Sequence, residues 1–190
     1  MSLAGHRPDN AVNTDRIFFI GNPWPEGHPI EIFNWSNEVR GGIAWFHFHL
    51  ETADYDSERS IEKEPEEGQS EWESADSWGN FHNCILSSTK WNRGGFPVCP
   101  VAQYEPAMLN GLELRVDPAP DKIELDKFAM YIYLLGHDTV GDHTIRFRKS
   151  VEPGCFDIDW RGKIALRYMD DTDFIYDFSA ELTRVPFPSL

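Results

Sequence analysis

The sequence predicts an all-β protein: an antiparallel β-sandwich of the jelly-roll kind or an open barrel, with little or no helix. Short stretches alternate apolar and polar side chains, which is the two-residue period of a strand. Turns rich in glycine and proline separate these stretches. The chain has 190 residues, 14% of them aromatic, which suits one domain with a single core.

Strands are predicted along most of the chain. In the first part they fall at residues 16–20, 30–35, 43–51, 81–87, 112–116 and 144–149. Near the C-terminus, residues 156–160 alternate apolar and acidic side chains. Arg161 and Gly162 can then turn the chain into a returning strand at 164–168, and a third strand is predicted at 174–182.

Residues 128–135 allow two interpretations. The run is apolar on both faces, as expected of a strand between two packed layers. Asp121 and Glu124 resemble a helix capping box, and Gly136 could end a helix. Tyr131 and Tyr133 favour the strand, and the helix remains open over 121–135.

An acidic loop or mobile insertion is predicted at about residues 52–76 of the single domain 1–190. From 51 to 76 there are eleven acidic residues against Arg59 and Lys63, so this stretch carries −9 of the formal net charge of −15. It has few apolar residues and contains Pro65 and Gly68, which is typical of a solvated segment.

The strong negative charge argues against nucleic-acid and membrane partners, because phosphates and anionic lipids repel it. No apolar run is long enough to cross a bilayer, and the N-terminus lacks a secretory signal. We therefore expect a soluble, cytoplasmic protein. Three cysteines without a C-x-x-C pair are expected to be reduced.

The segment 41–51 contains the most specific pattern. Alternation places Ala44, Phe46, Phe48 and Leu50 on one face of a strand, and it places Trp45, His47, His49 and Glu51 on the other. Imidazole and carboxylate groups are ligands for zinc, iron and manganese. Either this is a metal site or it is the solvated side of an amphipathic strand.

Gly41, His47 and His49 follow the spacing of the first motif of the cupins, which the chain in part resembles over about a dozen residues. The resemblance implies a double-stranded β-helix that binds one divalent transition metal through these histidines. At the position of the motif's glutamate the chain offers only Asp54, and the motif's closing glycine and a second motif are missing. His82, His137 and His143 are the candidates to complete the ligand set. His137 and His143 fall in a segment, 136–143, that also reads as a turn-rich loop.

Trp72 and Trp78 lie in or beside the acidic segment, together with Glu66 and Glu67. Tryptophan is enriched at the centres of protein interfaces, so these four residues are candidates for a partner-binding surface. Alternatively, the two rings anchor the loop to the core. No nucleophile elbow or phosphate-binding loop is present.

Two hypotheses follow. The first is a non-enzymatic binding module, without a cofactor, that recognises a basic protein partner through its acidic, tryptophan-containing loop. The second is a cupin-like, metal-dependent enzyme that uses His47 and His49 as metal ligands. The sequence favours the first.

Overall fold

A computed structural model describes residues 15–55, 68–91 and 94–190. Helix in these residues is confined to α1 (Ala75–Gly79) and short 3-10 turns such as η5 (Arg167–Met169). The strands are β1 (Arg16–Phe19), β2 (His28–Arg40), β3 (Ile43–Thr52), β4 (Ile85–Ser87), β5 (Phe96–Pro100), β6 (Glu113–Val116), β7 (Tyr131–Tyr133), β8 (His137–Lys149), β9 (Cys155–Ala165) and β10 (Tyr176–Pro186).

Eight of these strands close into an antiparallel barrel, in the order β1, β10, β9, β8, β7, β4, β3, β2 and back to β1. Closure depends on β2 and β8, because each pairs with different neighbours along its length. β2 pairs first with β1 and then with β3, and β8 pairs first with β7 and then with β9. β5 and β6 add to β3 and β8 outside this path.

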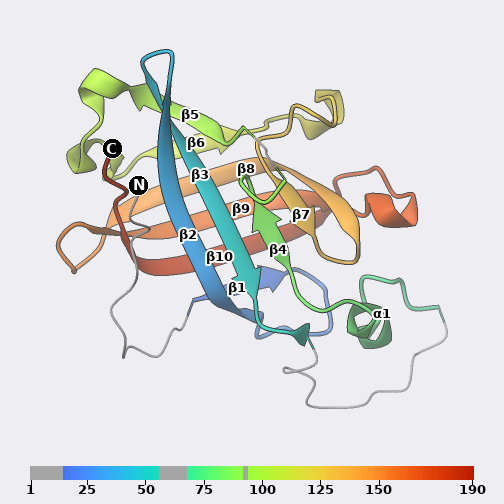
Figure 1. The fold of residues 1–190 in the computed structure, drawn as a ribbon. Helices are drawn as coiled ribbons and strands as arrows, with labels where there is room; N and C mark the ends of the chain where they lie inside the picture. Colours follow the sequence, from blue (N-terminus) through green and yellow to red (C-terminus); the bar gives the residue numbers. More distant parts are fainter. Residues whose placement is uncertain (1–14, 56–67, 92–93) are drawn as a thin grey trace.

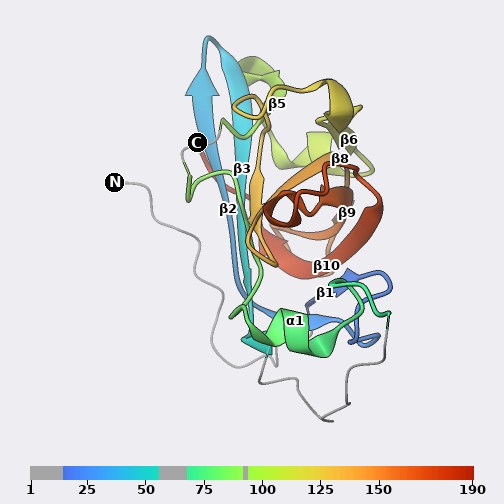
Figure 2. The same cartoon turned by 90° about the vertical axis from the view of Figure 1, so that its right-hand side faces the viewer.

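The prediction of an all-β fold with almost no helix is confirmed. Of the two predicted architectures the open barrel fits in part, because the strands form a barrel, but the barrel is closed; the sandwich is corrected to this closed barrel. β2 and β3 form one wall, and β8, β9 and β10 form the opposite one (Figure 1 and Figure 2). The strand order shows that these walls are joined through β1 on one side and through β4 and β7 on the other. Periodicity alone does not reveal closure, because a sandwich and a flattened barrel have the same alternation.

Aromatic rings fill the space between the walls. Trp35 of β2 lies 4.9 Å from Phe46 of β3 and 5.3 Å from Phe147 of β8, measured between ring centroids. Phe48 of β3 lies 5.3 Å from Trp160 of β9. Burying each of these side chains stabilises the fold by roughly 1.5–3 kcal/mol. The side chains of alternate strand residues therefore join the two walls.

The predicted hairpin at Arg161 and Gly162 is wrong, because β9 runs through both residues as one strand. Gly162 pairs with Phe178 of β10, and a Cβ atom at Gly162 would lie 2.6 Å from the Phe178 ring and 2.8 Å from Nδ1 of His143. This glycine therefore makes room for two buried rings and does not turn the chain.

The segment 136–143 is also not a loop, because most of it belongs to β8. The pairing of β8 with β9 shifts register between Gly141 and Thr144, as in a β-bulge, and Asp142 has a positive φ of 48°. The shift in phase allows Val140 before it and His143 after it both to be buried. Gly141 and Asp142, whose residue types are common in turns, lie at this irregularity within the strand.

The centre of residues 128–135 is the strand β7, so the strand interpretation holds there and the helix does not.

Part of the predicted acidic loop is ordered: Ser74 caps the short helix α1 by accepting a hydrogen bond from the Ser77 N–H. Residues 56–67 of the predicted loop lie outside the described residues.

The three cysteines, Cys84, Cys99 and Cys155, are buried and are not joined by a disulfide bond. Among the described residues, no helix has the length and apolar character needed to cross a membrane.

A Gly162→Ala substitution should lower the free energy of unfolding by about 1–3 kcal/mol, because the added methyl group overpacks the Phe178 and His143 rings. Urea unfolding measures this. The control is Gly94→Ala, whose Cβ would meet only Arg40 at 3.5 Å and which should stay within about 1 kcal/mol of the wild type. Equal stability of the two variants would contradict the packing described.

Candidate functional site

The outer face of β3 carries the polar residues that alternation predicts there. Phe46, Phe48 and Leu50 are fully buried in the core, which confirms the predicted phase of the strand. His47 and His49 therefore point out of the barrel wall and not into the barrel. A metal centre inside the barrel, which inward-facing histidines would have allowed, is not formed by these two residues.

His49 takes part in a chain of contacts on this outer face. Its Nδ1 lies 2.9 Å from Oγ of Ser87, and its Nε2 lies 3.0 Å from Oε1 of Glu51, which also contacts Nζ of Lys90 at 3.3 Å. The Ser87 Oγ accepts hydrogen bonds from the backbone N–H groups of Thr89 and Lys90. The serine hydrogen can then be donated to Nδ1 of His49 at 2.9 Å or to Oγ1 of Thr89 at 3.3 Å, and donation to the nearer Nδ1 places the imidazole hydrogen on Nε2, beside Glu51.

A serine, a histidine and a carboxylate in this order are the groups of a nucleophilic hydrolase. However, the side chain of Ser87 is completely buried and its Oγ caps the turn after β4. A substrate cannot reach it in this conformation. The contacts instead fix β4 against β3, and sequence reasoning missed Ser87 because it is 38 residues from His49.

His47 has a separate environment. Its Nε2 lies 3.5 Å from Oε2 of Glu38 without a hydrogen bond, and Glu38 is bound to Arg40 at 2.6 Å. The guanidinium of Arg40 lies 5.0 Å from the centre of the Trp45 ring. Burial, followed by the positive charge of Arg40, lowers the pKa of His47. At neutral pH this imidazole is therefore uncharged.

The six predicted metal ligands do not converge. His47, His49 and Glu51 have the contacts given above, and His82 is exposed beside Asp54, with 3.8 Å between Nδ1 and Oδ2. His137 is exposed on β8, whereas His143 is inside the barrel. In the parts of the chain that the structure describes, no group of three or more histidine, cysteine, aspartate or glutamate residues is arranged to hold a metal ion.

His143 is a buried polar group in the core. The Trp160 Nε1–H donates a hydrogen bond to its Nδ1 over 3.2 Å, which places the imidazole hydrogen on Nε2. Nε2 has no hydrogen-bond partner. Burial lowers the pKa of His143 to about 3, because a charged imidazole would lose its hydration without gaining a counter-ion.

This burial predicts a loss of stability in acid. The pKa of His143 is about 3 in the folded protein and near 6.5 in the unfolded chain. Below pH 6.5 the unfolded chain therefore takes up a proton that the folded protein does not. The free energy of unfolding therefore falls by up to about 1.4 kcal/mol per pH unit, and this loss accumulates as the pH falls towards 3.

The His143→Gln variant keeps an acceptor for Trp160 but does not titrate. Its free energy of unfolding should fall less steeply than that of the wild type between pH 6 and 4.5, by up to about 1.4 kcal/mol per pH unit. Urea unfolding at several pH values measures the two slopes. The exposed His137→Gln serves as the control and should follow the wild type. A His143→Gln slope equal to the wild-type slope would refute the buried neutral state.

The two predicted partner-binding tryptophans are in the core. Trp72 is 3% exposed and Trp78 is fully buried. The Trp72 Nε1–H donates to the Ile20 carbonyl and the Trp78 Nε1–H donates to the Trp72 carbonyl, each over 2.9 Å. They close one end of the barrel in a cluster with Phe19, Trp24, His28 and Tyr55.

This placement corresponds to the loop-anchoring alternative, in which the rings hold the segment and do not form a contact surface themselves. His28 stacks on Trp78 at 5.7 Å between ring centroids, and burial lowers its pKa to about 4. The other two predicted partner-binding residues, Glu66 and Glu67, lie outside the described residues.

Trp72 also brings two acidic parts of the chain together. Its ring stacks on Tyr176 of β10, with 4.3 Å between centroids, and burial and the negative charges of Asp171 and Glu73 raise the pKa of Tyr176. We call the resulting surface the acidic end; it consists of Glu71, Glu73, Asp76, Asp170, Asp171 and Asp173. Tyr168 and Ile175 are exposed on either side of the turn at 170–173, and the exposed Ile20 is joined to this end by the hydrogen bond from Trp72 to its carbonyl.

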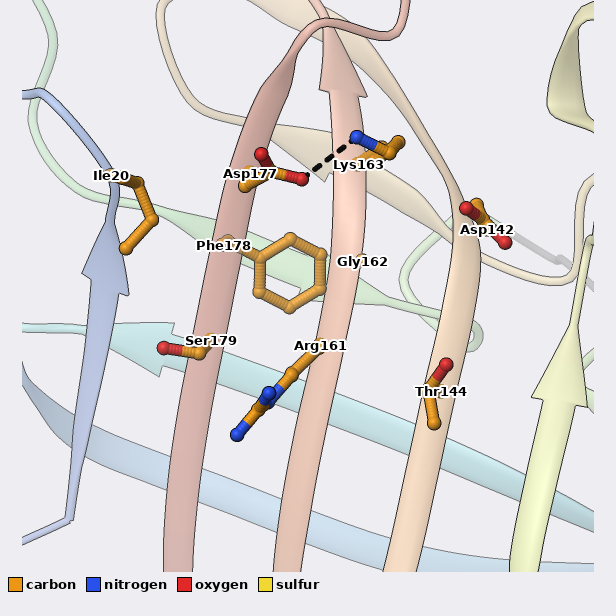
Figure 3. A pocket seen from close by; sticks show the side chains of 9 residues that line it. All are labelled: Ile20, Asp142, Thr144, Arg161, Gly162, Lys163, Asp177, Phe178 and Ser179. Carbon is orange, nitrogen blue, oxygen red and sulfur yellow. Dashed lines mark hydrogen bonds and ion pairs between the residues drawn. The ribbon is translucent and has the colours of Figure 1, made fainter.

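A hollow of about 380 Å³ lies on the outer wall formed by β8, β9 and β10. Its Lys163 is paired with Asp177, and its Asp142 is paired with Arg115. In Figure 3, Arg161 lies between the strands that carry Ser179 and Thr144. The hollow thus offers one guanidinium and two hydroxyl groups, which is chemistry suited to a small anion.

No protein-family model matches the chain, and comparisons with curated proteins and with solved structures find no match.

Proposed function

We propose that the chain is a binding module that recognises a basic protein partner through its acidic segment. The observation that carries the proposal is that buried aromatic residues anchor this charged segment to the barrel. Residues 51–76 carry −9, and the folded barrel binds both sides of the segment. Tyr55 near its start and Trp72 near its end are buried, and so is Trp78 just after it.

The acidic end enlarges this negative surface. Glu71, Glu73 and Asp76 come from the segment itself, and the turn at 170–173 adds three more carboxylates through the contact of Trp72 with Tyr176. Concentrated charge of one sign accelerates association with an oppositely charged partner and opposes partners of the same sign. Its range is about 8 Å at physiological salt, so the partner's basic groups must come close.

Exposed apolar groups give such a surface a second contribution. Ile175 is 61% exposed and Ile20 is 59% exposed, and the Ile20 N–H is bound to the carbonyl of Asp177 on β10. Apolar side chains surrounded by charge are the usual composition of a protein interface, where the apolar part supplies affinity and the charges supply orientation.

The variant that tests the proposal reduces the charge of the segment from −9 to −5 and keeps Tyr55 and Trp72 in place. Deleting residues 55–75 would remove Tyr55 and Trp72, so substitutions are preferable. Changing four glutamates to glutamine lowers the net charge from −15 to −11; they are Glu62, Glu64, Glu66 and Glu67. The probe is a short peptide of alternating lysine and serine. Isothermal titration calorimetry should show about tenfold weaker binding to the variant at low salt.

A control variant carries the same net charge but loses its four acids elsewhere, at the exposed positions Glu31, Glu105, Asp121 and Glu152. It should bind the lysine peptide nearly as well as the wild type does. A matched peptide of glutamate and serine should not bind. An equal loss of affinity in both variants would mean that only the total charge matters, which would contradict a role for the segment. If the wild type does not bind the lysine peptide, the proposal is rejected.

A further inference from the structure

Six aromatic rings follow one another along the outer surface of β4, β7 and β8 and the chain beside them. We call them the aromatic strip; in the order in which neighbouring rings contact one another they are Tyr168, Phe81, Tyr133, His137, Trp91 and Tyr131. The centroids of successive rings are 6.2, 6.3, 5.5, 6.0 and 6.5 Å apart. Tyr168 and His137 are exposed, and the other four rings are partly exposed. Of the six, only His137 was among the candidate site residues predicted from the sequence.

The sheet register explains the strip. Tyr131 and Tyr133 lie on β7, and Tyr133 pairs with His137 on β8. These rings point outwards because the residue between them, Ile132, is buried in the core. Tyr168 lies in η5, where its N–H donates to Oδ1 of the buried Asp138 over 3.2 Å. The strip is therefore held by strand pairing and by a buried hydrogen bond.

Carboxylates border the strip. Tyr168 is two residues before the acidic turn at 170–173, and Asp54 contacts His82, the neighbour of Phe81, at 3.8 Å. At the other end the Tyr131 hydroxyl donates to the Leu125 carbonyl, between Glu124 and Asp126. Among the described residues, three cationic side chains lie close by in the chain: Lys90 and Lys127 are paired with Glu51 and Asp126, and Arg167 immediately precedes Tyr168. The border is thus net negative.

We propose that the aromatic strip binds arginine side chains of an extended basic segment of the partner. This rests on the proposed function and names the chemistry of the partner. A guanidinium is planar and weakly hydrated, so it stacks on aromatic faces better than an ammonium does. The chain contains one such arrangement internally, with Arg40 at 5.0 Å from the centre of the Trp45 ring.

The spacing of the rings also fits an extended peptide. In a β-strand, every second side chain is on the same side, about 6.8 Å from the next. The centroids of Tyr168, Phe81 and Tyr133 are 6.2 and 6.3 Å apart in succession. Tyr131 then follows Tyr133 two residues along the same face of β7, and His137 and Trp91 lie beside these two tyrosines. A segment with an arginine at every second position can therefore place successive guanidiniums along the strip, with the bordering carboxylates within reach of their N–H groups.

The test compares two short peptides of equal charge, one of alternating arginine and serine and one of alternating lysine and serine, by calorimetry. The arginine peptide should bind the wild type about fivefold more tightly. Trp91→Leu and Tyr168→Leu should each lower the affinity for the arginine peptide about three- to fivefold. Their effect on the affinity for the lysine peptide should be much smaller. Trp45→Leu, which removes a ring outside the strip, should change the affinity for neither peptide. Thermal unfolding verifies that each variant is folded.

The outcomes separate this inference from the proposed function. Equal binding of the arginine and lysine peptides, unaffected by Trp91→Leu and Tyr168→Leu, would overturn the arginine site but leave the acidic binding module standing. Failure of both peptides to bind would reject the proposed function as well. A neutral glucose tetrasaccharide and a proline-rich peptide are titrated in parallel, because both can lie against aromatic rings; tighter binding of either would also overturn the inference.

Discussion

The filling of the barrel by aromatic side chains is the constraint on which the other features of this protein depend. Rings from β2 and β3 meet rings from β8 and β9 at centroid distances near 5 Å, and they occupy alternate positions of each strand. Every intervening side chain is therefore directed outwards. His47, His49, Glu51 and the rings of the aromatic strip occupy such outward positions or adjoin them. For this reason, both proposals are placed on the outer surface and the end of the barrel.

The same packing determines how polar groups inside the barrel are tolerated. His28 and His143 are both buried, and burial holds the pKa of each well below its ordinary value, so both are neutral at physiological pH. His28 is part of the cluster that receives Trp72 and Trp78 at one end of the barrel. The acidic end is thus attached to this buried aromatic cluster through Trp72, which positions its carboxylates.

Local alternation was sufficient to predict the all-β class, most strands and the outward direction of His47 and His49. It could not predict closure, because closure depends on β2 and β8 changing partners along their length. Gly162 resembled a turn residue, whereas its missing side chain makes space for Phe178 and His143. Contacts between distant residues, such as Ser87 with His49 or Tyr168 with Phe81, follow only from the register of the strands. For Trp72 and Trp78 the sequence allowed a contact surface or anchoring of the loop to the core, and their burial corresponds to the anchoring.

Mapping the peptide contact by NMR tests most directly whether this barrel binds basic partners at its acidic end and aromatic strip. Backbone amide shifts of labelled protein would be followed while the arginine peptide is added. Our account predicts that the largest changes fall in residues 54–82, 131–137 and 166–177. Changes concentrated instead on the outer face of β3 around His47 and His49, or in the hollow around Arg161, would contradict it, as would a spectrum that does not respond.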